Sequence, residues 1–173
     1  MRSRSATAPR CGGQLPSAPQ SRHSRCWQRL YNQQHTDGGW GWWVDDKSDV
    51  TVSSYVVFGL VKAKQAGFGV DENVIDRGVT YLKDKIVSPT QIKNSWEVNQ
   101  QAYLLYTLGE AGKSQTSALV ALYDGKRQLL GNYGKALLAL AFNLDGSNNQ
   151  SRINTLMSDL FGNAKASATG RPT

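Results

Sequence analysis

The chain has 173 residues, enough for one domain with a hydrophobic core but too few for two domains of usual size. Hydrophobic residues make up 39% and charged residues 19% of it, as in ordinary globular proteins, and no apolar run is long enough for a transmembrane helix. The formal net charge is +7, but residues 1–30 hold six arginines and no acid, which leaves 14 basic against 13 acidic side chains in the rest. This balance excludes the overall basic surface of a nucleic-acid-binding domain.

Residues 1–26 predict a disordered basic tail that is not part of the domain. They show no hydrophobic periodicity and contain three of the five prolines. The tail lacks the apolar segment of a secretory signal peptide, and its prolines argue against the helix of an organelle transit peptide. Both cysteines, Cys11 and Cys26, lie in it, and a disulfide between them is a disfavoured alternative.

A loop rich in tryptophan and glycine follows a short predicted helix over residues 26–34. Glycine permits close backbone approach, and a buried indole needs a partner for its N–H group. The sequence therefore predicts a structural loop whose indoles are wedged between helices. Its residues are Asp37, Gly38, Gly39, Trp40, Gly41, Trp42 and Trp43.

Two amphipathic helices are predicted after this loop. Ser48 or Asp49 can cap the first, which Gly67 ends, and Asp71 can cap the second, which ends before Pro89. The apolar faces recur at helical spacing. The first face comprises Val52, Tyr55, Val56, Gly59, Leu60 and Ala63, and the second Val74, Ile75, Gly78, Val79, Leu82 and Ile86.

Four more helices are predicted, over residues 94–111, 114–123, 132–144 and 150–161. A capping box from Asn94 to Glu97 opens the first of them. Their expected inward residues are Val98, Ala102, Leu105, Gly109, Leu119, Leu122, Tyr123, Tyr133, Leu137, Leu140, Ala141, Leu144, Ile153, Leu156, Met157 and Leu160. The predicted fold is all-α, with a domain over residues 27–164 and a frayed tail over residues 165–173.

Short connections predict antiparallel hairpins between neighbouring helices. Glycines within the predicted apolar stripes, at positions 59, 78 and 109, would let helices approach closely. A curved array of helical hairpins follows from these two features.

Residues 30–43, followed by Asp49 and residues 55–60, resemble the thioester domain of bacterial alpha-2-macroglobulin-like proteins. Residues 70–82 and 133–141 are similar to the same family, and the resemblance covers roughly residues 28–170. It implies an α/α toroid of the terpenoid cyclase and prenyltransferase type, here as an incomplete ring. The resemblance to the family is lost at both ends of the chain. This loss predicts that the chain is a fragment, produced by a misassigned start or a frameshift.

The resemblance also implies a function. Family members are large secreted or periplasmic protease traps: a protease cuts a bait region, and a reactive thioester then captures it covalently. We therefore expect a fragment of an endopeptidase inhibitor that supplies helical scaffold and is not an enzyme. The expected partners are proteases and the remaining domains of the parent protein. No cofactor, metal or nucleic acid is expected, and the open ends of the ring predict self-association.

The family thioester joins a cysteine thiol to a glutamine side chain three positions later. Cys11 and Gln14 have this spacing and are the candidate pair. The glutamate of the family motif is missing, and Pro16 and Pro19 follow where the family continues into a helix. These departures favour a chance match.

Two alternatives stay open. A toroid enzyme is suggested because Gln34 and the following Gly38-Gly39-Trp40 are similar to the repeats of terpene cyclases. However, Asp45-Asp46 lacks a third carboxylate, and neither histidine has zinc-ligand partners at usual spacing. A helical peptide-binding module would use aromatic side chains on a concave face, with Trp96, Tyr103 and Tyr106 as candidates.

Overall fold

The computed structural model describes residues 27–146 and 148–169, with side chains described to residue 162. Every regular element in these ranges is a helix, which confirms the all-α prediction. A short helix over residues 27–32 comes first. The others are α2 (Val50–Gln65), α3 (Glu72–Asp84), the 3₁₀ turn η1 (Pro89–Gln91), α4 (Ser95–Glu110), α5 (Thr116–Lys126), the 3₁₀ turn η2 (Arg127–Leu129), α6 (Asn132–Asp145) and α7 (Gln150–Thr169).

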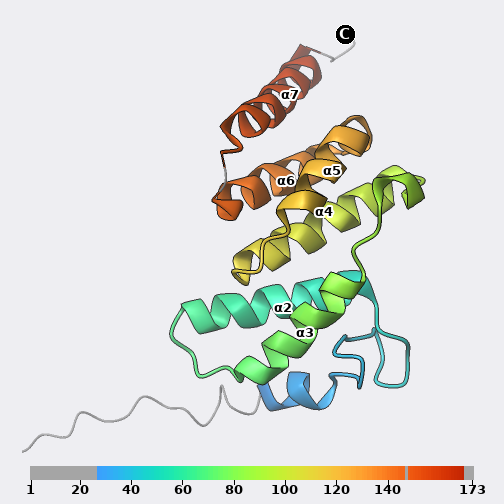
Figure 1. The fold of residues 1–173 in the computed structure, drawn as a ribbon, viewed down its shortest axis with the longest axis vertical. Helices are drawn as coiled ribbons and strands as arrows, with labels where there is room; N and C mark the ends of the chain where they lie inside the picture. Colours follow the sequence, from blue (N-terminus) through green and yellow to red (C-terminus); the bar gives the residue numbers. More distant parts are fainter. Residues whose placement is uncertain (1–26, 147, 170–173) are drawn as a thin grey trace, which may run out of the picture.

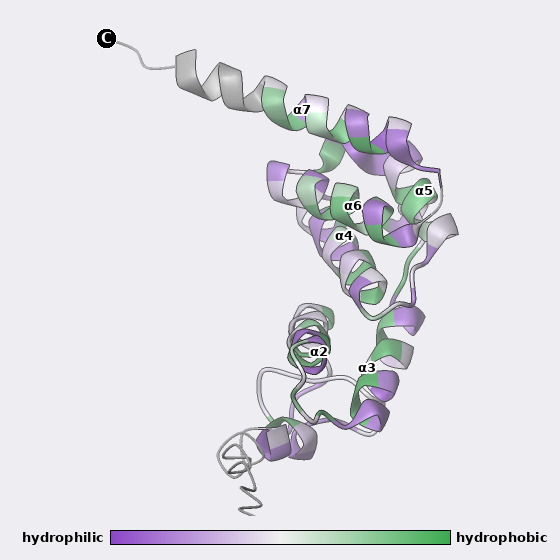
Figure 2. Cartoon of the chain, turned by 90° about the vertical axis from the view of Figure 1, so that its left-hand side faces the viewer, coloured by the Kyte–Doolittle hydropathy of each residue, from purple (hydrophilic) through white to green (hydrophobic). Residues whose placement is uncertain are grey.

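The helices form a two-layered array rather than a bundle around one axis (Figure 1). Helices α2, α4 and α6 pack side by side, and α3, α5 and α7 each pack against the helix that precedes them. Helix α5 also contacts α6. The pairs α2–α3 and α6–α7 lie at opposite ends of the array (Figures 1 and 2). This arrangement agrees with the predicted array of hairpins.

The helix ends follow the capping residues of the sequence. The side chains of Asp49, Asp71 and Asn94 each accept a hydrogen bond from a backbone N–H in the first turn of α2, α3 and α4. The reciprocal bond of the Asn94 box is displaced by one residue, because the Glu97 carboxylate accepts from the backbone N–H of Lys93 at 2.6 Å. Three glycines with positive φ follow helix ends: Gly67, Gly112 and Gly146.

The buried face of α2 differs from the predicted one. Val57, Leu60 and Val61 are buried. Of the predicted face Leu60 is buried, Val52 and Val56 are half-buried against the core, and Tyr55 is 71% exposed. Helix α2 is apolar on more than one side, so two stripes fit its periodicity equally well. The loop before the helix decides between them, because Trp40 packs on the side that carries Ser53 and Val57.

The predicted faces of α3 and α4 are confirmed, apart from a half-buried Ile86. On α6 the prediction is right for Leu137 and Ala141 and wrong for Tyr133, Leu140 and Leu144, which are exposed. Leu138 and Phe142 are buried on α6, and the Phe142 ring packs edge-on against Tyr123 of α5 with centroids 5.9 Å apart. Helix α7 runs to Thr169, beyond residue 164 where the apolar periodicity ends.

The three glycines expected at helix contacts behave differently. A methyl carbon on Gly78 would lie 2.5 Å from Val57 Cγ2 and 2.9 Å from Trp40 Cζ3, and one on Gly109 would lie 3.3 Å from Leu144 Cδ1. One on Gly59 would meet nothing within 4 Å, so that prediction is wrong. Among the described residues, none of the helices has the length and apolar character needed to span a membrane.

Candidate functional site

Trp40 is the centre of the loop that the sequence singled out. Its side chain is 2% exposed, and its Nε1 donates a hydrogen bond to the carbonyl of Leu30 at 2.8 Å. Its backbone N–H donates to Ser53 Oγ at 2.8 Å, and its carbonyl accepts from the Asp49 N–H at 2.9 Å. The side chain and backbone of Trp40 together therefore join the helix of residues 27–32 to α2, and the indole ring lies against Gly78 of α3.

Gln34 fastens the other side of the loop to α3. Its Nε2 donates to the carbonyl oxygens of Gly38 and Val74, both at 2.9 Å, and its Oε1 accepts from Arg77 Nη2. Every polar atom of this amide thus has a partner in the scaffold. A group saturated in this way can position the loop but offers nothing to a substrate.

His35, Ser48 and Asp37 form a hydrogen-bonded chain beside the loop. The Ser48 hydroxyl donates to Asp37 Oδ1 at 2.7 Å, and His35 Nδ1 lies 2.9 Å from Ser48 Oγ. Because the hydroxyl hydrogen points to the carboxylate, Nδ1 must be the donor toward Oγ. In a hydrolytic triad the histidine accepts the serine hydrogen, so this order of donors does not activate the hydroxyl. These three side chains hold the loop closed, and their hydrogen bonds do not activate Ser48 as a nucleophile.

Asp37 is held in its charged form by this chain. Burial alone would raise its pKa, but the hydrogen bonds from the Ser48 hydroxyl and the Gly39 N–H outweigh it, so the Asp37 pKa lies below 3.8. The carboxylate therefore stabilises the fold above the pH of its unfolded pKa, and this contribution is lost as the pH falls through the lower folded pKa. The hydrogen bonds among His35, Ser48 and Asp37 were not predicted from the sequence, because these residues are separated by up to 13 positions.

Only one of the three clustered indoles is buried. Trp42 and Trp43 are 74% and 75% exposed, and Val44 next to them is 59% exposed. The prediction that the loop wedges its indoles between helices is thus confirmed for Trp40 and wrong for the other two. Trp40 has buried partners on three elements, whereas the other two indoles follow the turn at Gly41 and point out of the fold.

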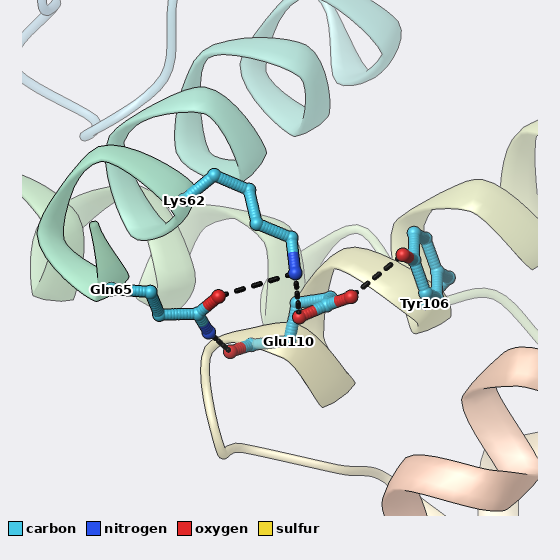
Figure 3. Close-up of polar contacts among 4 residues, drawn as sticks. All are labelled: Lys62, Gln65, Tyr106 and Glu110. Carbon is cyan, nitrogen blue, oxygen red and sulfur yellow. Dashed lines mark hydrogen bonds and ion pairs between the residues drawn. The ribbon is translucent and has the colours of Figure 1, made fainter.

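A second polar cluster joins α2 to α4 (Figure 3). Glu110 Oε2 lies 2.6 Å from Lys62 Nζ, and Glu110 Oε1 accepts from Tyr106 Oη at 2.6 Å. Gln65 adds a hydrogen bond to the Glu110 carbonyl at 3.3 Å. Burial would raise the pKa of the Glu110 carboxyl, but its hydrogen bonds with Lys62 and Tyr106 outweigh burial and lower it.

The alkaline titration of Tyr106 tests this cluster. Burial, and the Glu110 carboxylate that accepts its hydrogen, raise the Tyr106 pKa from 10.0 to about 12. A raised folded pKa means that its stabilisation is complete below pH 10.0 and is lost as the pH rises toward about 12. We expect Tyr106→Phe to remove part of the tyrosinate absorbance change near pH 12. Its free energy of unfolding should also fall less than that of the wild type between these pH values.

Two comparisons make the titration specific. Tyr103, whose pKa burial also raises to about 12, should still titrate in the Tyr106→Phe protein. Glu110→Gln, which replaces the carboxylate that accepts from Tyr106 Oη and raises its pKa, should move the Tyr106 titration to lower pH. A Tyr106→Phe curve identical to that of the wild type would contradict the hydrogen bond with Glu110.

The remaining candidate residues are placed as follows. Cys11, Gln14 and Cys26 lie outside the described residues. Within the described ranges, no group of three or more His, Cys, Asp or Glu side chains could hold a metal ion. Of the candidate aromatic surface, Trp96 is 64% exposed, whereas Tyr103 and Tyr106 pack on Phe58 with ring centroids 6.5 and 5.7 Å away.

The fold is shared with solved structures of one kind of protein. Native alpha-2-macroglobulin from Escherichia coli matches 76% of this chain at a TM-score of 0.65 and 20% sequence identity, over 9% of that chain. Trypsin-activated E. coli alpha-2-macroglobulin matches the same share at 0.64, over 10% of its chain. A fragment running from domain MG7 to the C-terminus also matches at 0.64, over 22% of its length. The described array therefore has the helical fold of a region of alpha-2-macroglobulins.

Sequence comparison gives the relationship directly. No protein-family model matches the chain. The alpha-2-macroglobulin of Thermotoga maritima is 46% identical over 55 residues, which is 32% of this chain and 4% of that protein. The chain thus spans a small part of the relatives that it matches. Together with the shared fold, this match confirms the resemblance and relates the chain to a region of the bacterial alpha-2-macroglobulin family.

Proposed function

We propose that this chain supplies helical scaffold to the thioester-containing domain of a bacterial alpha-2-macroglobulin-like endopeptidase inhibitor. The observation that carries the proposal is the 46% identity to the Thermotoga maritima protein, supported by the fold shared with the E. coli structures. The scaffold belongs to an incomplete α/α toroid. The chain itself catalyses no reaction.

The geometry of the loop supports a structural role. Gln34 and Asp37 direct their hydrogen bonds to the loop and α3, and Trp40 bonds to Leu30 and Ser53. Such a set of paired groups fixes three elements relative to one another. A thioester domain needs this rigidity, because burial must keep water from a reactive acyl carbon until activation. Cys11 and Gln14 lie outside the set, and a bond between them stays an unfavoured prediction.

Proteases are the partners in this proposal. Two of the matched E. coli structures are described as activated by trypsin and by porcine elastase. A parent protein that met such enzymes would work outside the cell or in the periplasm. Its other domains would cover the ends of the helical array, which otherwise offer apolar surface for self-association.

A chimera tests the scaffold role. The matched 55 residues of the Thermotoga maritima protein would be replaced by those of this chain. We expect the chimera and the unmodified relative, each mixed with trypsin in parallel, to form the same amount of covalent protease adduct on a denaturing gel. A control chimera with the same residues in shuffled order should form no adduct. The proposal would be refuted if the chimera with the residues of this chain in native order failed to fold. It would also be refuted if that chimera folded but formed no adduct with trypsin.

A further inference from the structure

A cluster of cationic side chains lies where α5, α6 and α7 meet (Figure 1). It comprises Arg127 of η2, Lys135 of α6 and Arg152 of α7, and we call it the cationic cluster. Asp159 Oδ2 lies 3.7 Å from Arg127 Nε and 3.6 Å from Lys135 Nζ. The guanidinium carbons of Arg127 and Arg152 lie 5.2 and 5.8 Å from the centroid of the Tyr123 ring. The three cations therefore share one region of the fold.

Lys135 is the most buried of these cations. Its side chain is 10% exposed, and the 3.6 Å between its ammonium and Asp159 is longer than a charge-assisted hydrogen bond of about 2.7–2.9 Å. A charge that is mostly buried without hydrogen bonds is costly. The ammonium still touches solvent, because the fully enclosed side-chain polar atoms without a hydrogen bond in the described ranges are His35 Nε2 and Thr107 Oγ1. A small ion can therefore reach Lys135 Nζ.

Asp159 does not compensate the charge of the cationic cluster. Three cations around one carboxylate leave an excess of two positive charges. In the part of the chain that the structure describes, no other carboxylate lies within 4.0 Å of these cations. Asp145 is linked to Arg152 through Asn149, which forms hydrogen bonds with both. The cluster thus has room in its charge balance for an anion.

The free donors of the cluster suit an anion with oxygens in several directions. Arg127 Nη1 donates to Tyr123 Oη at 2.8 Å, and Arg152 Nη1 donates to Asn149 Oδ1 at 3.0 Å, so both guanidinium groups are held in place. Their other N–H groups remain available for a ligand. A guanidinium is weakly hydrated and forms charged hydrogen bonds with phosphate oxygens. A doubly charged tetrahedral anion would match the excess charge and contact donors from three elements.

We propose that the cationic cluster binds one phosphate or sulfate ion between η2, α6 and α7. The ion accepts hydrogen bonds from Lys135 Nζ and from the guanidinium groups of Arg127 and Arg152. Because the donors come from three elements, the bound ion ties α7 to the rest of the array. This inference does not depend on the proposed function.

Titration calorimetry of the full-length chain tests the site with sodium phosphate as the probe. Sodium chloride at the same ionic strength is the reference, because it reproduces the general screening of charges. We expect saturable binding of one phosphate per chain, and sulfate should compete for the same site. Acetate, a planar anion with a single charge, should bind more weakly. A phosphate titration equal to the chloride reference, or tighter binding of acetate than of phosphate, would overturn the proposal.

A matched pair of lysine variants assigns the binding to the cluster. Lys135→Met keeps an unbranched apolar side chain in the buried position and removes the charge. It should weaken phosphate binding about tenfold or more, the size expected for a hydrogen bond to a charged group. Lys113→Met makes the same change at an exposed lysine that follows α4, and it should leave the affinity unchanged. Equal phosphate affinities in the two variants would show that the ion binds elsewhere.

Asp159→Asn separates an anion site from a simple ion pair. The substitution removes a negative charge that competes with the ion, so phosphate should bind more tightly than to the wild type. Arg127→Gln, at a side chain that is 27% exposed, should weaken binding and replaces Lys135→Met if that variant does not fold. Circular dichroism checks that each variant keeps its helices. Unchanged or weaker phosphate binding in a folded Asp159→Asn protein would mean that Asp159 already fills the site, and the proposal would be wrong.

Discussion

Replacing Trp40 by alanine should lower the free energy of unfolding by roughly 3–5 kcal/mol, the range for large buried aromatics. The side chain is 2% exposed, and its ring and the Val57 side chain of α2 both lie against Gly78 of α3. Its loss would open a cavity where the helix of residues 27–32, α2 and α3 meet. It would also leave the Leu30 carbonyl without its 2.8 Å hydrogen bond. The stability of a domain this small is of similar size, so much of the protein should unfold.

Urea denaturation followed by far-ultraviolet circular dichroism measures this loss without relying on tryptophan fluorescence. Trp42→Ala is the matched control, because it removes the same side chain two residues away from a site that is 74% exposed. Its effect should stay within about 0.5 kcal/mol. Similar losses in the two variants would mean that the loop does not join the three elements through Trp40.

The contrast between these tryptophans shows where sequence reasoning stops. Trp40, Trp42 and Trp43 are of the same residue type and lie in one glycine-rich loop, and the number of adjacent glycines does not tell which indole is buried. What separates them is Ser53 on α2 and Gly78 on α3, which the chain brings to Trp40 from 13 and 38 residues away. Burial of an aromatic residue in a loop is thus decided by tertiary contacts.

Helix ends were predictable for the opposite reason. The Asp49 carboxylate accepts from Val52, three residues along, and the Asn94 amide from Glu97. Such caps depend only on nearby residues, so a single sequence is enough to locate them. The inward face of α3 was also predictable, because its charged residues leave one apolar stripe. Helix α2 has apolar residues on several sides, and only its neighbours select the buried one.

The candidate site shows the same division. Its loop, which includes Asp37 and follows Gln34, was recognisable from sequence because glycines and tryptophans cluster there. The hydrogen bonds that make it a structural loop were not, since Val74 and Ser48 approach from other segments. Residue types such as His, Ser and Asp suggest chemistry only after their donors and acceptors are known. In this site the Ser48 hydroxyl donates to Asp37 and not to His35, so the three residues do not form a catalytic triad.

The closest backbone approach in the loop makes Gly38→Ala a sharper test of its packing. Gly38 has φ of +88°, a conformation that costs other residues about 1–2 kcal/mol. A methyl carbon at this position would also lie 2.9 Å from the Arg77 carbonyl carbon and closer still to its oxygen. Backbone atoms cannot rotate away, so α3 or the loop must move, at a further cost of about 1–3 kcal/mol. We expect a total loss of about 3 kcal/mol.

Gly67→Ala separates the two contributions. Gly67 has nearly the same φ, +86°, but a methyl carbon there would meet nothing within 4 Å. This variant should lose only the conformational part, about 1–2 kcal/mol. The difference between the two free energies of unfolding therefore measures the contact between the loop and the Arg77 backbone. Because Gly38 also accepts the hydrogen bond from Gln34, movement of the loop would break the link to Val74 at the same time. Equal losses in both variants would show that the loop can separate from α3 at no cost, and the structural role assigned to it would be wrong.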